Sequence, residues 1–558
     1  NASANGKIVL TFDEKVKLTD KANATLGTQK IEGVVSGKTI TFAYKGLNYA
    51  TAYTFTLAAG SVADLTDNAT DQAIVLNFTT KTKPAVTKAL YDFIVPTDGD
   101  FKAALAAAAK RTDTSKRFRI FIKQGDYKIP ADEKSKVTGS DGKSYANPTT
   151  YMNTPNVSII GESMDNTSLT NTVPNSGQSA NVLEGIGKGD VLCLQKGATN
   201  TYFQDLKMYS SMGDAKGRDI ILNDQSNKTI CKNVNLWAYQ DTYVSNNQNG
   251  KFYFEDGILR GRTDYLCGKG DVYYNNVELW ICEKGGYLAV PSQPKKYGYI
   301  FKDCTIKDAT AAKDLNGNYT LGRPWGKGTP IALYINTKME AIPSAAGWNE
   351  MSGGYPKRFA EYNSYTTTGS VVDLKDRKKV YDAYDSKDGD NYVNRRNETA
   401  GDPILTAEEA ATYTIETVMG QDDDWDPTAA TEQASAPSNV KLNGTTLAWD
   451  NNDYALLWAV CKNGKVVDFT IKPTYLVDDA SATWSVRAAN EMGGLSEATA
   501  AVLGTGIHNI ASATDAAVIK TIIFAADGTQ LSNLQKGINI IVKTLADGSK
   551  KTSKVIVK

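Results

Sequence analysis

The chain has 558 residues, which at about 150 residues per domain predicts three to four domains. Its 62 Lys and Arg balance its 62 Asp and Glu, and this zero net charge argues against a nucleic-acid-binding surface, which needs a basic excess or stripe. No run of about 18 apolar residues exists, so no membrane-spanning segment is expected.

The single histidine, His508, excludes two common kinds of hydrolytic site from the main body of the chain. A Ser-His-Asp triad needs a histidine beside its nucleophile, and a hydrolytic zinc site usually needs two or three. The six cysteines form no CxxC pair or metal spacing, and we expect buried free thiols. Any hydrolysis must therefore use carboxylates, Arg, Lys, Tyr or a hard cation; we expect no metal and no cofactor.

The residue patterns divide the chain into four parts. Residues 1–82 alternate apolar and polar positions in short runs, which predicts a β-sandwich similar to bacterial immunoglobulin-like modules. The segment DFKAALAAAAKRTD then predicts a helix, and strand patterns continue to about residue 420. Residues 435–503 predict a second sandwich, similar to fibronectin type III. Residues 506–558 predict a β-rich segment that resembles the C-terminal sorting modules of secreted Bacteroidetes proteins.

We expect the central domain to span residues 88–425, and a six-residue unit recurs within it between residues 203 and 306. It reads aromatic-or-Cys, any, Asn/Asp, any, any, aliphatic, and its copies lie 20 to 28 residues apart. Such spacing predicts a parallel β-helix, in which stacked coils bury an apolar face that no coil can bury alone. The copies are FQDLKM (203–208), CKNVNL (231–236), FEDGIL (254–259), YNNVEL (274–279) and FKDCTI (301–306).

Two aspartates occupy the same position in successive units. Asp241 and Asp264 each lie ten residues after the first residue of their unit, which predicts two carboxylates on one face, about 4.8 Å apart by strand spacing. Like charges at this distance repel by about 3 kcal/mol, or about two pKa units, at an effective dielectric constant near 20. One acid would then carry a proton and the other a charge, as an acid and a nucleophile require.

Aspartate also occurs at polar turns in any β-helix. The equal offset alone does not distinguish a functional pair of acids from two ordinary turn residues. The neighbouring Arg260 and Arg262, and the segment KGD (269–271), favour a functional pair.

Residues from about 88 to 370 resemble the pectin methylesterase (pectinesterase) family. The resemblance rests on several motifs in the family's order rather than on one. They are DGDFKAALAAAAKR, FIKQGDYKI (121–129), SIIGESMDNTSLT (158–170), YQDTYV (239–244), GRTDYLCG (261–268), LGRPW (321–325) and AGWNEM (346–351).

The resemblance implies a role for individual residues. Asp264 would attack the methyl-ester carbonyl of a galacturonate unit, and Asp241 would act as general acid and then as general base. Gln240 would donate to the oxyanion, and Arg323 would hold Asp264 ionised. Trp325 would pack against a sugar ring; alternatively, it could be a buried core residue. The remaining substrate-binding candidates are Arg218, Tyr243 and Tyr265.

Two positions depart from the family pattern. Arg218, in GRDIIL, stands where the family usually has a second oxyanion Gln, and Ile129 stands where it often has Glu. A guanidinium can also donate to an oxyanion, but it adds a positive charge. Arg218 either faces the site beside Gln240 or turns away to pair with Asp219 or Asp224. Both departures affect substrate preference more than the reaction.

The sequence therefore predicts an all-β protein built on a right-handed parallel β-helix with small β-sandwich domains at both ends. We expect a secreted, periplasmic or surface-held bacterial monomer that removes methyl esters from pectin. Three alternatives remain: a β-helix polygalacturonase, which also uses paired acids; a calcium-dependent pectate lyase; and a non-catalytic glycan-binding or adhesion protein.

Overall fold

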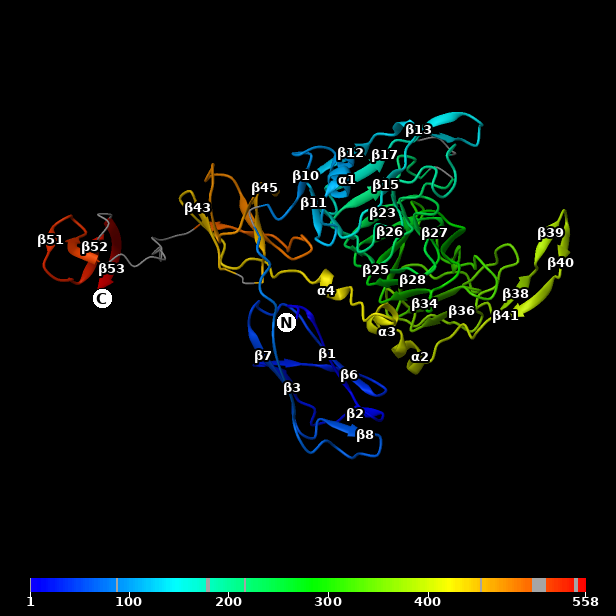
Figure 1. Cartoon of the computed structure of the whole chain (residues 1–558), viewed down its shortest axis with the longest axis horizontal. Coiled ribbons are helices and arrows are strands. Elements are labelled where there is room, and N and C mark those ends of the chain that lie inside the picture. Colours follow the sequence, from blue (N-terminus) through cyan, green and yellow to red (C-terminus); the bar gives the residue numbers. More distant parts are fainter. Residues whose placement is uncertain are drawn as a thin grey trace.

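The structure is a computed structural model, and it describes residues 2–86, 89–176, 181–214, 217–451, 454–503, 518–545 and 550–557. His508 lies outside the described residues. Figure 1 shows a central stack of strands, a sandwich of N-terminal strands beside it, a second sandwich at one end of the stack, and the C-terminal strands beyond that. Among the described helices, none is both long and apolar enough to cross a membrane.

Three long parallel sheets form the central stack in the described part of the chain. A complete coil contributes one strand to each sheet, as β22 (Thr229–Lys232), β23 (Asn235–Trp237) and β24 (Tyr243–Ser245) do, and the next coil pairs with it in parallel. The coils at the two ends lack a strand in the seven-stranded sheet. This strand order confirms the predicted parallel β-helix. The predicted helix is also confirmed: α1 (Phe101–Lys110) begins at the N-cap Asp100, whose side chain accepts the amide of Ala103.

We name the three sheets by their strand counts. The ten-stranded sheet comprises β10 (Phe93–Val95), β11 (Phe118–Ile122), β16 (Val157–Gly161), β19 (Tyr202–Gln204), β22, β25 (Lys251–Glu255), β28 (Asp271–Asn275), β31 (Tyr299–Lys302), β34 (Ile331–Ile335) and β36 (Arg358–Tyr362). The nine-stranded sheet comprises β12 (Gly125–Ile129), β17 (Thr167–Asn171), β20 (Lys207–Tyr209), β23, β26 (Ile258–Gly261), β29 (Glu278–Ile281), β32 (Thr305–Asp308), β35 (Lys338–Met339) and β37 (Tyr365–Thr366). The seven-stranded sheet comprises β15 (Thr150–Met152), β18 (Leu192–Leu194), β21 (Leu222–Asp224), β24, β27 (Thr263–Gly268), β30 (Gly286–Pro291) and β33 (Tyr319–Gly322).

The remaining described elements flank the three sheets. The N-terminal strands are β1 (Gly6–Thr11), β2 (Val16–Leu18), β3 (Ala24–Leu26), β4 (Gln29–Ile31), β5 (Gly33–Ser36), β6 (Thr39–Tyr44), β7 (Ala52–Leu57), β8 (Val62–Asp64) and β9 (Ile74–Thr79). Short strands that project from the β-helix are β13 (Asp132–Thr138), β14 (Ser144–Asn147), β38 (Val380–Ala383), β39 (Ser386–Asp388), β40 (Asn391–Val393) and β41 (Arg396–Thr399). After the β-helix come α2 (Ala407–Thr412), α3 (Ile415–Gly420), α4 (Thr428–Thr431), β42 (Lys441–Asn443), β43 (Thr446–Ala448), β44 (Leu457–Lys462), β45 (Lys465–Thr470), β46 (Thr474–Leu476), β47 (Trp484–Ala489), β48 (Thr499–Ala500), β49 (Val502–Leu503), β50 (Val518–Ala525), β51 (Gln530–Leu531), β52 (Gly537–Leu545) and β53 (Lys550–Val557).

The repeat unit of the sequence spans the corner between the ten-stranded and the nine-stranded sheet. Its first residue points inward, where successive rings stack: Phe254 on Tyr274, Tyr274 on Phe301, with ring centroids 5.2 and 4.6 Å apart. Its sixth residue, such as Leu259, is also buried. Its third residue has positive φ, a conformation that Asn and Asp adopt more readily than other L-residues. These corner residues are Asp205, Asn233, Asp256, Asn276 and Asp303.

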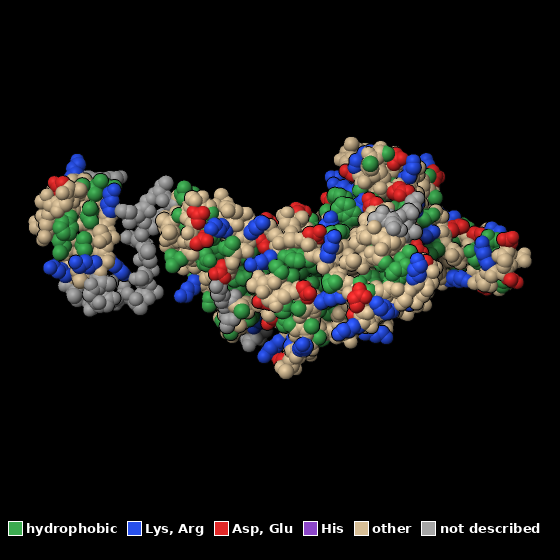
Figure 2. Space-filling view, turned by 90° about the horizontal axis from the view of Figure 1, so that it is seen from above, with side chains coloured by type: hydrophobic (Ala, Val, Ile, Leu, Met, Phe, Trp, Pro, Cys, Tyr) green, Lys and Arg blue, Asp and Glu red, His purple; other side chains and the backbone are tan. Residues whose placement is uncertain are grey.

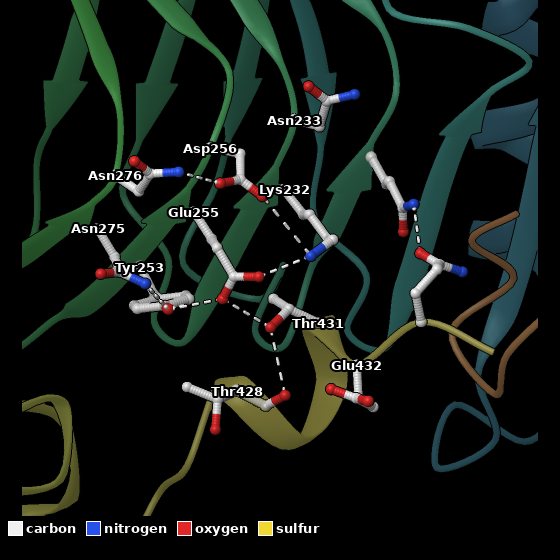
Figure 3. Close-up of polar contacts among 12 residues, drawn as sticks. Lys232, Asn233, Tyr253, Glu255, Asp256, Asn275, Asn276, Thr428, Thr431 and Glu432 are labelled. Carbon is white, nitrogen blue, oxygen red and sulfur yellow. Dashed lines mark hydrogen bonds and ion pairs between the residues drawn. The ribbon is translucent and has the colours of Figure 1, made fainter. Parts of the chain in front are cut away.

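The corner side chains bond to one another between coils. Asn276 donates its amide to Asp256 at 2.7 Å, and Asn336 donates to Asp303 at 2.9 Å. Figure 3 shows the first of these contacts, with α4 lying against the same coils. There Thr431 donates to the Glu255 carboxylate, which also pairs with Lys232. The asparagine and aspartate column therefore fixes how one coil sits on the next.

The outer face of the ten-stranded sheet is covered. Tyr253 and Tyr273 on that face pack in one apolar cluster with Val418 and Met419 of α3, and the second sandwich extends the same cluster. The buried Lys251 pairs with Asp423 just after α3. Since this face is occupied by the chain itself, an open site must lie on another part of the β-helix.

Charged side chains of both signs are interspersed on the face drawn in Figure 2, with no basic stripe. On the same face, hydrophobic side chains gather on the C-terminal sheet. The six cysteines are free and five of them are buried, as expected for small apolar residues.

The corner column can be tested at Asn336, whose φ is +54° and whose side chain bonds to Asp303 and Asn363. Asn336→Ala should lower the free energy of unfolding by about 1–3 kcal/mol, because it loses both bonds and because Ala adopts the left-handed conformation less readily than Asn. Asn336→Gly loses the same bonds without the backbone penalty and should be the more stable of the two. Urea unfolding measures both, and equal stabilities would contradict a role for the left-handed turn.

Candidate active site

The two predicted acids lie in one column at the entrance to the seven-stranded sheet. Arg218 bridges in parallel to Gln240, and Gln240 bridges to Thr263, so that Asp241 and Asp264 follow at equivalent places in adjacent coils. The amide of Asp241 donates to the carbonyl of Thr263 at 3.2 Å. Both aspartates have positive φ, 57° and 52°, and both side chains are about 8% exposed.

Arg323 holds the carboxylate of Asp264 in a two-pronged contact. Its Nε donates to Oδ1 at 2.9 Å and its Nη2 to Oδ2 at 2.6 Å. The guanidinium also stacks 3.9 Å from the ring centroid of Tyr287, which fixes its plane. Paired N–H groups of this kind favour the ionised carboxylate and orient it. Arg323 is therefore the group that orients the Asp264 carboxylate.

Asp241 has a different environment. Burial, and then the negative charge of Asp264, raise the pKa of Asp241 to about 7, although Arg218, Arg323 and the Cys267 thiol oppose the rise. At neutral pH this carboxyl is thus divided between its protonated and ionised forms. Burial is the larger cause of this raised pKa, whereas the shift predicted from the sequence rested on charge repulsion at the strand spacing alone.

A pocket of about 240 Å³ opens over the acids. Trp325, 38% exposed, and Gln240 stand in its wall, and the wall is otherwise largely apolar. The pocket is lined by Ile186, Arg218, Gln240, Asp241, Asp264, Cys267, Val290, Trp325 and Met351. Such a site can take a ring with a small apolar substituent and present two carboxyl groups and several N–H donors to it.

Arg218 faces the site. Its Nε lies 3.2 Å from Oδ2 of Asp241, and its side chain is about half exposed. The alternative that it turns away to Asp219 or Asp224 is wrong, because its ion pair is with the general-acid candidate itself. The Arg218 guanidinium therefore lies within reach of both Asp241 and a molecule bound in the pocket.

Four sequence-based expectations fail at this site. Tyr243 and Tyr265 cannot bind substrate through their rings, because both are fully buried in the core of the β-helix. Arg260 points away and pairs with Asp214. Arg262 donates to the hydroxyl of Thr263 and does not reach the acids.

Several site residues were not foreseen. Tyr287 stacks against Arg323, and Ile186 enters the pocket wall from a loop with no motif of its own. Met351 ends the AGWNEM motif, but the motif alone predicted no role for it in the site. Asp219, beside Arg218, is buried and binds the backbone of the next coil. In the described part of the chain, no group of three or more His, Cys, Asp or Glu residues could hold a metal ion.

Fold and site together define a parallel β-helix protein with a paired-carboxylate pocket. Residues 92–396 match the pectinesterase family, and residues 1–80 match the bacterial Ig-like domain family. This chain belongs to the pectinesterase family.

Similar proteins bear the same family name. The chain is 23% identical over 291 residues to Pectinesterase 1 of Solanum lycopersicum, covering 50% of this chain and 48% of that protein. It is 29% identical over 165 residues to Probable pectinesterase A of Aspergillus oryzae, covering 28% and 48%. The chain thus spans about half the length of the curated relatives it matches. Among solved structures, pectin methylesterase from carrot gives a TM-score of 0.46 at 16% identity, covering 63% of this chain and 99% of that one.

The charge of Asp264 contributes to the raised pKa of Asp241, and a substitution separates this contribution from that of burial. In Asp264→Asn the pKa of Asp241 should fall, yet stay above its ordinary value, because burial is the larger cause. Arg218→Gln should raise it. Carboxyl ¹³C NMR titration measures both shifts. Asp256→Asn, on another corner of the coil of Asp264, is the control and should leave this pKa unchanged; no shift in Asp264→Asn would contradict the coupling.

Proposed function

We propose that this protein is a pectin methylesterase, which hydrolyses methyl esters of galacturonate units and releases methanol. The observation that carries the proposal is the pair of stacked carboxyl groups with divided roles. Asp264 is held by the fork of Arg323, and Asp241 has a pKa of about 7. Membership of the pectinesterase family supports the substrate class.

In the first half of the reaction, a carboxylate oxygen of Asp264 attacks the ester carbonyl carbon. The carbonyl oxygen becomes an oxyanion, to which the Gln240 side chain and the Arg218 guanidinium donate N–H groups. The intermediate collapses by breaking the bond to the methoxy oxygen. Asp241 gives its proton to that oxygen, methanol leaves, and an acyl group remains on Asp264.

In the second half, Asp241 is ionised and takes a proton from water. The water oxygen attacks the acyl carbon, the bond to Asp264 breaks, and the galacturonate leaves as a free acid. Asp264 is again a carboxylate and Asp241 again carries a proton. Arg323 keeps the leaving Asp264 charged, and Trp325 packs against a sugar ring in the pocket.

The protein acts outside the cytoplasm, as a secreted or surface-held bacterial enzyme and as a monomer. The N-terminal match to bacterial Ig-like domains supports a spacer or glycan-contacting role for that part of the chain. Its partner is methyl-esterified pectin, and nucleic acid is not a partner, given the balanced charge.

One assay separates this function from its rivals. Highly esterified pectin is incubated with the protein, and methanol, reducing ends and unsaturated products are measured together. Methanol alone supports the esterase, and it should persist in EDTA. New reducing ends would indicate a glycosidase, calcium-dependent unsaturated ends a lyase, and none of the three a binding protein.

The nucleophile is tested by Asp264→Ala, which should reduce methanol release to less than a few per cent of the parent's rate, because no other carboxylate lies in the fork of Arg323. The matched control is Asp256→Ala. Asp256 belongs to the same coil and also has positive φ, but it lies on the corner column. The control should keep its activity. Substantial turnover in Asp264→Ala would overturn the assignment.

Arg218 should favour pectin that carries free carboxylates near the methylated unit. When Asp241 is protonated, the charge of Arg218 is uncompensated and half exposed, so it attracts a neighbouring carboxylate. Arg218→Gln should reduce the preference for low-esterified over high-esterified pectin by about two- to fivefold, the size of one partly exposed ion pair. Added salt should reduce the parent's preference in the same direction. An unchanged ratio and salt dependence would contradict the role.

A further inference from the structure

A third aspartate continues the column of the two acids. The amide of Asp219 donates to the carbonyl of Gln240 at 3.2 Å, as the amide of Asp241 donates to the carbonyl of Thr263. Since each carbonyl belongs to the residue before the next aspartate, Asp219, Asp241 and Asp264 occupy equivalent places in three adjacent coils.

Asp219 differs from the other two in its backbone and its surroundings. Asp241 and Asp264 have positive φ and line the pocket. Asp219 does not have positive φ and does not line the pocket. Its residue exposure is 2%. Its Oδ1 accepts the amide of Gln240 at 3.1 Å and that of Tyr239 at 3.3 Å. The carboxyl thus binds the backbone of the residues that lead into Asp241.

We propose that Asp219 is a positioning residue of the site, whose carboxyl fixes the peptide groups of Tyr239 and Gln240 and so sets the place of Gln240 and Asp241. The role in turnover rests on the proposed esterase function. Without an acceptor, the buried amide of Tyr239 and the part-buried amide of Gln240 would lose their partner, and the chain would shift to pair them elsewhere. Displacement by about 1 Å of groups that handle the oxyanion and the proton is costly to the rate.

The buried surroundings of Asp219 favour its neutral form over its charged form. Burial, and to a lesser extent the nearby Asp241, raise the pKa of Asp219 well above its ordinary range, although the two backbone amides and the Ser210 hydroxyl oppose the rise. A neutral Asp219 adds no third negative charge to a site where an oxyanion develops, while its Oδ1 still accepts both amides.

Two substitutions test the proposal. Asp219→Ala removes the acceptor and should lower kcat by about 10- to 100-fold. Asp219→Asn keeps a neutral acceptor oxygen of the same shape and should retain kcat within about threefold, with the pH profile of kcat/KM unchanged. Hydrogen exchange of the peptide that contains Tyr239 and Gln240, followed by mass spectrometry, should be faster in the Ala variant and unchanged in the Asn variant.

The matched control is Asp224→Ala. Asp224 is also a fully buried carboxyl that accepts a backbone amide, that of Ser226, but it contacts no site residue. The Asp224→Ala variant should lose stability, as Asp219→Ala does, but it should keep the kcat of the parent. The proposal is overturned if Asp219→Ala keeps kcat, if Asp219→Asn is as inactive as Asp219→Ala, or if Asp219→Asn moves the pH profile. If the parent releases no methanol, the esterase function fails, whereas the exchange result still decides whether Asp219 holds these amides.

Discussion

Everything in the β-helix depends on the register between coils, in which each residue pairs with the residue at the same place in the next coil. Backbone pairing along three sheets leaves no freedom to slip, because a shift by one residue would turn every inward side chain outward. Loops between strands differ in length, yet the columns remain aligned. The stacked rings of Phe301 and Tyr334, with centroids 4.3 Å apart, the asparagine and aspartate corner, and the acid column are three results of the same constraint.

Which sheet faces are covered by other parts of the chain determines where the aligned side chains can form an active site. Alpha helices and the second sandwich close the outer face of the ten-stranded sheet, where Tyr253 and Tyr273 are buried. The column at the entrance to the seven-stranded sheet stays open, and loops carrying Ile186 and Met351 rise beside it to form the pocket. Outward side chains thus become buried where other parts of the chain cover their sheet, and they can line a pocket where the sheet stays open.

The sequence predicted the β-helix and the acid pair because both follow from offsets within the repeat. It did not predict the burial of Tyr243, because the left-handed turn at Asp241 interrupts the alternation of sides on which such counting relies. It missed Asp219 for another reason. In the coil that starts at Phe203 the equivalent offset is 219 − 203 = 16 rather than ten, so a six-residue insertion hides the third aspartate. Partners such as Tyr287 carry no motif, since contact across coils leaves no short-range pattern.

The site resolves a conflict between the two tasks proposed for Asp241. As an acid it must hold a proton until methanol departs, and as a base it must release that proton before water attacks. A group serves both tasks best when its pKa lies near the working pH. Burial and Asp264 push the pKa of Asp241 upward, and Arg218 and Arg323 pull it down, with a result of about 7. A neutral amide side chain at position 218 could donate to the oxyanion, but it could not lower the pKa of Asp241 against the effect of burial. The positive charge of Arg218 therefore acts on the proton of Asp241, in addition to the role proposed for it toward the substrate.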